Sequence, residues 1–274
     1  MPRIVIFQSR TGIDPAANAA ALVQAIRHAK DGGAVMLFTP EMSGLLDGNR
    51  KRAVDQVRTE EEDIVLSTVR EAARAHAMWV HLGSLAVRIA GGKLANRAFV
   101  IDPTGEIVGR YDKIHLFDVD LPTGESWRES ASYNPGADPV VVRGTPVGTL
   151  GLTICYDLRF PALFARLSEA GAEMIAVPAA FTVPTGKAHW HILLRARAIE
   201  AGLFVVAAAQ SGHHEDGRTT FGHSLVVDPW GDVLLDGEDG EKLLFADIDL
   251  ARNAEVALRI PVLKHRRQIG AVND

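Results

Sequence analysis

Short runs of apolar residues alternate along this chain with segments of helical periodicity, and this alternation constrains the fold more than any other feature. The first run, residues 4–7, is short and continuously apolar, as expected of a strand covered on both faces. Similar runs follow at residues 34–38, 79–86, 147–154, 173–178 and 203–208. Buried strands that alternate with helices are typical of an α/β protein with largely parallel sheets.

Capping residues predict where two of the helices begin. Asp14 is a candidate N-cap, and Pro15 suits the first position of the helix that follows. Thr59 and Glu62 have the spacing of a capping box, which predicts a second helix near 60–76. The expected helices cover residues 15–30, 60–76, 160–170 and 188–201.

Two ten-residue segments share a pattern. FVIDPTGEIV at 99–108 and LVVDPWGDVL at 225–234 both place Asp-Pro-x-Gly between apolar, largely β-branched flanks. Asp-Pro-x-Gly is turn chemistry, so each copy is predicted to form a β-hairpin. The repeat indicates two similar βα halves that pack sheet against sheet.

Composition excludes several classes of protein. The 274 residues carry a formal net charge of −5, which argues against a general nucleic-acid binder. No apolar run is long enough to span a membrane, and MPRIVIFQSR lacks the pattern of a secretory signal. A single cysteine excludes an intrachain disulfide and an all-thiolate metal site. With no linker in the chain, we expect one domain over residues 1–274 and a cytoplasmic location.

Common catalytic and metal-binding motifs are absent from the sequence. It contains no GxxxxGK[ST], GxGxxG, GxSxG or HExxH, which disfavours kinases, dinucleotide-dependent dehydrogenases, lipases and zincins. His213 and His214 lie in a segment that is predicted to be a solvated loop. His189 and His191 flank Trp190 near a helix start, where packing or capping is expected. The ten histidines therefore predict no metal site.

Three residues of complementary chemistry follow predicted strands. Glu41 comes after the strand at 34–38, Lys113 after the second strand of the first hairpin, and Cys155 after the run at 147–154. Reactive groups gather at the carboxyl ends of strands in open α/β sheets. Each residue also has an alternative, purely structural interpretation. Glu41 could be an acid at a helix start, Lys113 a surface cation and Cys155 a buried structural thiol. No spacing in the sequence proves that the three meet.

These residue types suit nucleophilic attack on an amide. A thiol is mostly protonated near neutral pH, so it needs a carboxylate to accept its proton. An ammonium group stabilises both a thiolate and a tetrahedral oxyanion. A depressed pKa at Cys155 would favour an enzyme over a binding protein with an inert thiol.

The segments FTPEMS, GRYDKIHLFDVD and GLTICYDLRFP resemble, in that order, the carbon–nitrogen hydrolase (nitrilase) superfamily. The resemblance runs from IVIFQS to IPVLKHRR, and PAAFTVPTGKAHWHILLRARAIE and AAAQSGHHEDGRTTFGHSLVVDPWG are similar to its Nit branch. Ala162 and His191 depart from the acids that many relatives carry there. The resemblance implies a four-layer αββα sandwich and a homodimer or higher homo-oligomer.

The resemblance also implies roles for individual residues. Glu41 is similar to the general base, Lys113 to the oxyanion-stabilising cation and Cys155 to the nucleophile of the family. Glu129 matches a second glutamate that holds Lys113 and the substrate, and the Tyr156 N–H would share the oxyanion role. No metal or organic cofactor is implied.

The Nit branch includes amidases of deaminated glutathione and ω-amidases of 2-oxo acid amides, so the implied substrate is a small amide that carries a carboxylate. Arg159 is the candidate partner of that carboxylate, with a structural ion pair as the alternative. Tyr156, Phe181 and Thr182 are candidate walls of the pocket, and Arg195 and Arg197 are expected on a helix surface. A nitrilase, an N-carbamoyl amidohydrolase or a non-catalytic Nit-like protein remains an alternative.

Overall fold

Two six-stranded sheets form the centre of the computed structural model, which describes residues 1–120, 124 and 126–270. The first sheet has the order β16 (Lys242–Asp247), β1 (Arg3–Gln8), β2 (Met36–Phe38), β3 (Trp79–Arg88), β4 (Leu94–Ile101) and β5 (Ile107–Asp112). The second has the order β15 (Val233–Asp236), β14 (Leu225–Val227), β11 (Phe204–Ala207), β10 (Met174–Ala176), β9 (Gly148–Leu152) and β8 (Val140–Thr145). Two small ribbons pair β6 (Asp118–Asp120) with β7 (Ser126–Arg128) and β12 (Ser211–His213) with β13 (Thr219–Phe221).

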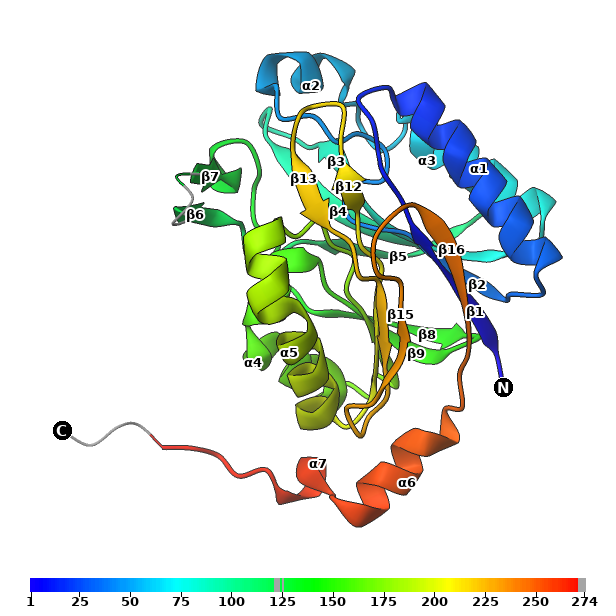
Figure 1. Ribbon diagram of the computed structural model, residues 1–274, viewed down its shortest axis with the longest axis vertical. Helices are drawn as coiled ribbons and strands as arrows, with labels where there is room; N and C mark the ends of the chain where they lie inside the picture. Colours follow the sequence, from blue (N-terminus) through cyan, green and yellow to red (C-terminus); the bar gives the residue numbers. More distant parts are fainter. Residues whose placement is uncertain (121–123, 125, 271–274) are drawn as a thin grey trace.

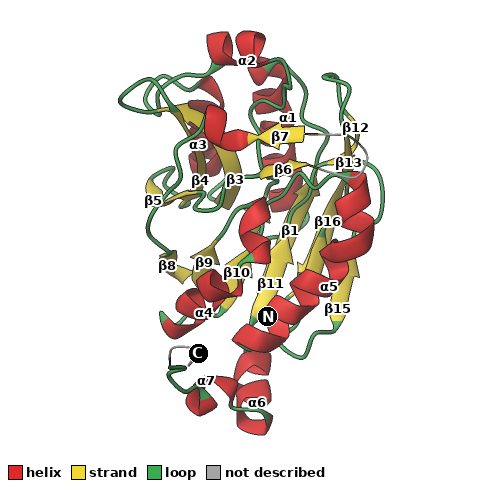
Figure 2. Cartoon of the chain, turned by 90° about the vertical axis from the view of Figure 1, so that its left-hand side faces the viewer, coloured by secondary structure: helices red, strands yellow, loops and turns green. Residues whose placement is uncertain are grey.

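Helices cover the outer face of each sheet. In Figure 1, α1 (Pro15–Asp31) and α3 (Ile64–Ala75) lie over the first sheet, and α4 (Pro161–Glu169) and α5 (Val183–Ala201) lie over the second. The molecule is therefore the four-layer αββα sandwich that the family resemblance implies, and Figure 2 shows it from the side. The remaining helical segments are α2 (Arg50–Gln56), α6 (Ala251–Arg259), α7 (Val262–His265), η1 (Glu129–Ala131) and η2 (Cys155–Arg159). In the described part of the chain, every helix is too short or too polar to cross a membrane.

The apolar run of β1 serves two different cores. Ile4 and Ile6 point between the two sheets, whereas Val5 and Phe7 pack under α1 and α3. Successive side chains of a strand point to opposite faces, so a strand covered on both sides must be apolar throughout. This arrangement explains why the run at 4–7 shows no alternation of polar and apolar residues.

The weak sequence repeat corresponds to a repeat of topology. β4 and β5 form an antiparallel hairpin beside the parallel strands of the first sheet. β14 and β15 form the equivalent hairpin beside the parallel strands of the second. The predicted hairpins and the face-to-face sheets are thus both confirmed.

Two predicted helix starts are wrong. α3 begins at Ile64, where the Asp63 carboxylate accepts a hydrogen bond of 2.9 Å from the Leu66 N–H. Thr59 and Glu62 instead bond to each other in the preceding turn. α5 begins at Val183, five residues before the apolar periodicity that predicts it, because Pro184 occupies its first turn.

Candidate active site

The site lies where strand ends from the two sheets meet. Glu41 follows β2, Lys113 follows β5, and Cys155 opens η2, three residues after β9. The structure brings these three side chains together, and they are 5%, 2% and 8% exposed. Their juxtaposition requires contact between the two sheets, because β2 and β5 belong to one sheet and β9 to the other.

A glycine permits the backbone around the site to approach closely. A Cβ on Gly83 would lie 2.0 Å from the Thr39 carbonyl oxygen and 2.6 Å from Cβ of Pro178. The Pro178 carbonyl accepts the Cys155 N–H at 2.9 Å. Gly83 therefore lets the turn that carries Glu41 and the segment that anchors Cys155 pack against each other.

Lys113 is held between two carboxylates. Its Nζ lies 2.9 Å from Oε1 of Glu41 and 2.9 Å from Oε2 of Glu129, the first residue of η1. The Phe117 N–H donates to Oε2 of Glu129 at 2.7 Å, which fixes that carboxylate. Burial alone would lower the pKa of Lys113, but Glu129 and Glu41 raise it well above its ordinary value, so the ammonium stays charged.

Asn96 is a site residue that the sequence reasoning missed. Its Nδ2 donates to Oε1 of Glu41 and to Oε1 of Glu129, both at 3.0 Å. The Ala180 N–H donates to the other oxygen of Glu41 at 3.1 Å. A single asparagine on a strand carries no recognisable chemical motif, and only the fold places it between the two glutamates.

Cys155 has a backbone conformation that is unusual for a residue with a side chain. Its φ is +50°, in the left-handed region. Asp157, two residues later, is completely buried and holds this turn through hydrogen bonds. The Asp157 carboxylate accepts the Ile154 N–H at 2.9 Å, the Tyr111 hydroxyl at 2.7 Å and the His115 N–H at 3.0 Å. Asp157 was also missed, although an acid two residues after a candidate nucleophile is a signal that could have identified it.

The thiol is neutral at rest. Burial raises the pKa of Cys155 well above its ordinary value, the Glu41 carboxylate raises it further, and Lys113 opposes both only in part. The structure therefore does not supply the depressed pKa that would have favoured an enzyme, because the ammonium lies between two carboxylates. The arrangement can instead transfer the thiol proton to Glu41 when a substrate arrives.

All eight candidate residues line one cavity of about 400 Å³. Tyr156, Phe181 and Thr182 contribute to its wall, as predicted, and Arg50, Arg128, Arg159 and Arg218 surround it with positive charge. The Arg159 guanidinium lies 5.8 Å from the ring centre of Tyr156 and 5.6 Å from that of Phe181. Among the described residues no carboxylate pairs with Arg159, so the structure does not support the ion-pair alternative.

Expectations for three residues outside the cavity need correction. His214 is buried and bonded to the Thr11 carbonyl and the Thr220 hydroxyl, while His213 is exposed at the end of β12. His191 lies in the middle of α5 and not near its start; the expected packing is present, against the rings of Phe221 and His223, and the side chain also pairs with Asp236. Arg197 is 5% exposed, and its Nε donates to the Leu158 carbonyl of η2.

Comparison with known proteins agrees with this geometry. A family model described as carbon–nitrogen hydrolase matches residues 4–257. A deaminated glutathione amidase from Yersinia enterocolitica is 39% identical over 98% of this chain and 94% of its own. The crystal structure of the Caenorhabditis elegans NitFhit protein superposes with a TM-score of 0.90 at 36% identity, over 97% of this chain and 65% of that longer one. An amidase variant from Nesterenkonia sp. AN1, with acrylamide added to its active-site cysteine, superposes with a TM-score of 0.78 at 28% identity, over 94% and 99% of the two chains.

Proposed function

The chain belongs to the carbon–nitrogen hydrolase family and is a thiol-dependent amidase, and we propose that it hydrolyses small amides that carry a carboxylate, of the deaminated glutathione type, with Cys155 as the nucleophile. One observation carries this proposal: Cys155, Glu41 and Lys113 are buried side by side in the wall of an arginine-lined cavity. A thiol, a carboxylate and an ammonium are the groups that amide attack requires.

Glu41 would transfer the proton in the first half of the reaction. It accepts the proton of Cys155 as Sγ bonds to the amide carbon, and the carbonyl oxygen becomes an oxyanion beside the Lys113 ammonium and the Tyr156 N–H. The C–N bond then breaks as Glu41 returns the proton to the nitrogen. An amine or ammonia leaves, and the acyl group remains on Cys155 as a thioester.

Water completes the reaction. Glu41 accepts a proton from the water as its oxygen attacks the thioester carbon, and a second oxyanion forms at the same position. The C–S bond breaks, the acid product leaves, and the proton returns to Sγ. The resting state is the neutral thiol, in agreement with the raised pKa of Cys155.

Positive charge in the cavity supports a substrate with a carboxylate. In the described residues, Arg128 pairs with Asp120 and Arg218 with Asp216, whereas Arg50 and Arg159 pair with no carboxylate. A guanidinium binds a carboxylate through two parallel hydrogen bonds. The relative from Yersinia enterocolitica, named deaminated glutathione amidase, supports the same substrate class.

The decisive experiment measures 2-oxoglutarate released from deaminated glutathione and from 2-oxoglutaramate. We expect the wild-type chain to release it and Cys155→Ala to lose at least about 10³-fold in kcat. The ratio of the two kcat/KM values then identifies the preferred amide. Arg159→Ala should raise KM for these substrates and leave hydrolysis of propionamide, which has no carboxylate, unchanged.

Other outcomes would point to the alternatives. Turnover of nitriles or N-carbamoyl compounds but of neither amide would assign another activity to the same residues. Release of 2-oxoglutarate by Cys155→Ala at the wild-type rate would overturn the mechanism. Absence of turnover with every one of these compounds would favour the remaining alternative, a non-catalytic Nit-like binding protein.

A homo-oligomer in the cytoplasm completes the proposal. Ile192 and Ile199 are 70% and 47% exposed and lie two turns apart on α5, which suits contact with a second copy. A reducing compartment keeps a nucleophilic thiol such as that of Cys155 available for reaction. Light scattering after gel filtration tests the first point, and Ile192→Glu should lower the measured mass.

A further inference from the structure

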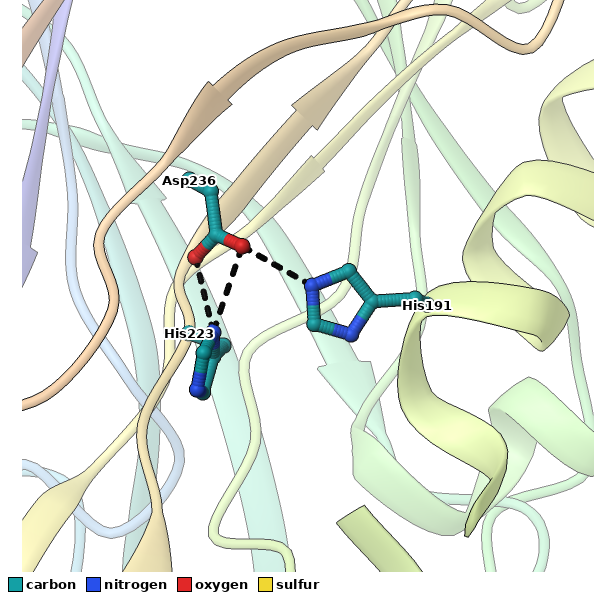
Figure 3. Close-up of side chains that lie close together, drawn as sticks. All are labelled: His191, His223 and Asp236. Carbon is teal, nitrogen blue, oxygen red and sulfur yellow. Dashed lines mark hydrogen bonds and ion pairs between the residues drawn. The ribbon is translucent and has the colours of Figure 1, made fainter. Parts of the chain in front are cut away.

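Two histidines and an aspartate converge beside α5, outside the lining of the cavity that contains Cys155. His191 comes from α5, His223 lies two residues before β14, and Asp236 ends β15 (Figure 3). One ligand atom from each lies within 4.8 Å of the other two. Nε2 of His191 is 2.9 Å from Oδ2 of Asp236, and Nδ1 of His223 is 2.9 Å from Oδ1.

This cluster is separate from the cavity that contains Cys155. None of its three residues lines that cavity. The link between them is Trp190, whose Nε1 donates to the His223 carbonyl at 2.7 Å and whose ring lies 4.7 Å from that of Phe181. The mechanism proposed above makes no use of the cluster, and the inference that follows does not depend on it.

Two of the three side chains are held in place by the surrounding structure. The His223 ring stacks on Phe221 with centres 4.4 Å apart, and its backbone has a φ of +53° that Trp190 and Glu238 fix through hydrogen bonds. The Glu238 N–H donates to Oδ1 of Asp236 at 2.8 Å. His191 is partly exposed, so an ion can reach the cluster from solvent. Ordered ligands with one accessible side are typical of a metal site.

We propose that His191, His223 and Asp236 bind one Zn²⁺ ion or a similar divalent transition metal, with water as the fourth ligand. Two imidazole nitrogens and one carboxylate oxygen form a ligand set that suits Zn²⁺, whereas Mg²⁺ and Ca²⁺ prefer oxygen alone. The ring nitrogens that would bind the ion now donate hydrogen bonds to Asp236, so each neutral imidazole must move that proton to its other ring nitrogen when the ion binds, and no proton is released.

The ion would connect α5 to the hairpin of β14 and β15. His191 is the ligand from the helix, and the other two ligands come from the edge of the second sheet. A ligand that binds only the folded state stabilises it. We therefore expect Zn²⁺ to raise the melting temperature without adding a group to the active site.

The test is a titration of the full-length chain, without a histidine tag, in the Cys155→Ala background. That background removes the one thiol, which could otherwise bind the same metal. Calorimetry with Zn²⁺ and visible absorption with Co²⁺ should each give one ion per chain. His191→Ala should weaken binding by more than about 100-fold and abolish the rise in melting temperature.

Matched variants make the result specific. His213→Ala removes an exposed histidine outside the cluster and should bind the metal as its parent does. Asp236→Asn keeps the shape of the side chain but removes its charge, and should weaken binding. Circular dichroism verifies that each variant is folded. Absence of stoichiometric binding, equal binding by His191→Ala, or an equal loss in His213→Ala would overturn the proposal.

Discussion

The chemistry of the candidate site depends on a neutral thiol beside an ionised pair. Lys113 lies between Glu41 and Glu129, so its charge is largely offset and only partly opposes the effect of burial and Glu41 on the Cys155 thiol. A buried ion pair is costly unless its remaining hydrogen-bonding groups are satisfied, and Asn96 and the Ala180 N–H satisfy them here. The site is therefore arranged for transfer of the Cys155 proton to Glu41 during attack on the substrate, and Cys155 is not a thiolate before the substrate binds.

Modification of Cys155 to a methyl disulfide tests this interpretation. Methyl methanethiosulfonate reacts with thiolates and carries no amide, so its rate reports the ionised fraction of the thiol. Because the pKa of Cys155 is raised, we expect slow reaction at neutral pH and a rise of about tenfold per pH unit into the alkaline range. Glu41→Gln should react faster at neutral pH and yet lose amide hydrolysis. A rate that is already pH-independent near neutrality would contradict the neutral thiol.

Glu129 positions Lys113 and should affect turnover more than binding. Glu129→Gln keeps a hydrogen-bond acceptor beside Nζ but removes one of the two charges that raise the pKa of Lys113. We expect kcat to fall by about 10²-fold, the scale of an impaired oxyanion donor, with a smaller change in KM. Steady-state kinetics provide the measurement, with Glu173→Gln as a control far from the cavity. An unchanged kcat would exclude the positioning role.

His81 makes the stability of the fold sensitive to acid. It is fully buried beside Phe38, and neither ring nitrogen has a partner among the described residues. Burial lowers its pKa to about 3. The folded state therefore keeps His81 neutral, while the unfolded chain takes up a proton near pH 6.5. This contribution to stability is complete above that pH and is lost as the pH falls toward about 3.

Urea unfolding at several pH values measures this effect. We expect the free energy of unfolding to decrease below about pH 6.5 by up to about 1.4 kcal/mol per pH unit from His81 alone. His81→Leu should remove that part of the slope, whereas His213→Leu should keep it. Identical slopes for wild type and His81→Leu would show that His81 is not buried in the neutral form.

At the scale of single elements, competing capping residues decide where helices begin. Thr59 and Glu62 match a capping box in spacing, yet the Asp63 carboxylate accepts the Leu66 N–H and begins α3. Both candidates lie within five residues, and the choice between them depends on which register buries Val65, Leu66 and Val69 under the first sheet. Periodicity locates a helix more reliably than it locates its first residue.

Alanine substitutions separate the two candidate caps. Asp63→Ala leaves the Leu66 N–H without its acceptor and should lower the free energy of unfolding by about 1 kcal/mol. Thr59→Ala removes only an exposed bond to Glu62 and should change it by less than about 0.5 kcal/mol. Urea denaturation compares both with wild type. A larger loss from Thr59→Ala would restore the predicted capping box.

For the whole molecule, the packing of one sheet on the other creates both the core and the site. Ile4, Ile6 and Phe38 of the first sheet share a core with Leu150 and Leu152 of the second. The same packing brings Glu41 and Lys113 to Cys155, because these residues follow strands of different sheets. Stability and site geometry are therefore linked through one interface.

A substitution that creates a cavity in this core tests the link between stability and the geometry of the site. Leu152 is completely buried, so Leu152→Ala should cost about 2–5 kcal/mol in the free energy of unfolding. Leu258 is 84% exposed on α6, so Leu258→Ala should cost less than about 0.5 kcal/mol. We also expect amide turnover to fall in Leu152→Ala while the chain is still folded. Unchanged turnover would mean that the catalytic residues are positioned independently of the packing between the sheets.

The sequence by itself indicated the strands and hairpins of this protein and predicted the members of its catalytic set. Continuous apolar runs require strands covered on both faces, and the paired Asp-Pro-x-Gly segments predict two hairpins, because these are local consequences of side-chain chemistry. Glu41, Lys113, Glu129 and Cys155 were identified through short motifs and their order. Their catalytic roles, and the assignment of residues 1–274 to one domain, stay predictions.

Only the tertiary structure decided what surrounds those residues. Asn96 and Asp157 support the site through contacts between segments far apart in the chain, and the cluster of His191, His223 and Asp236 joins a helix to a sheet edge. The pKa of Cys155 has the same origin, since burial and Glu41 outweigh Lys113 only in the folded arrangement. Distances between such groups depend on how the layers pack, and packing is a property of the whole chain that no local pattern contains.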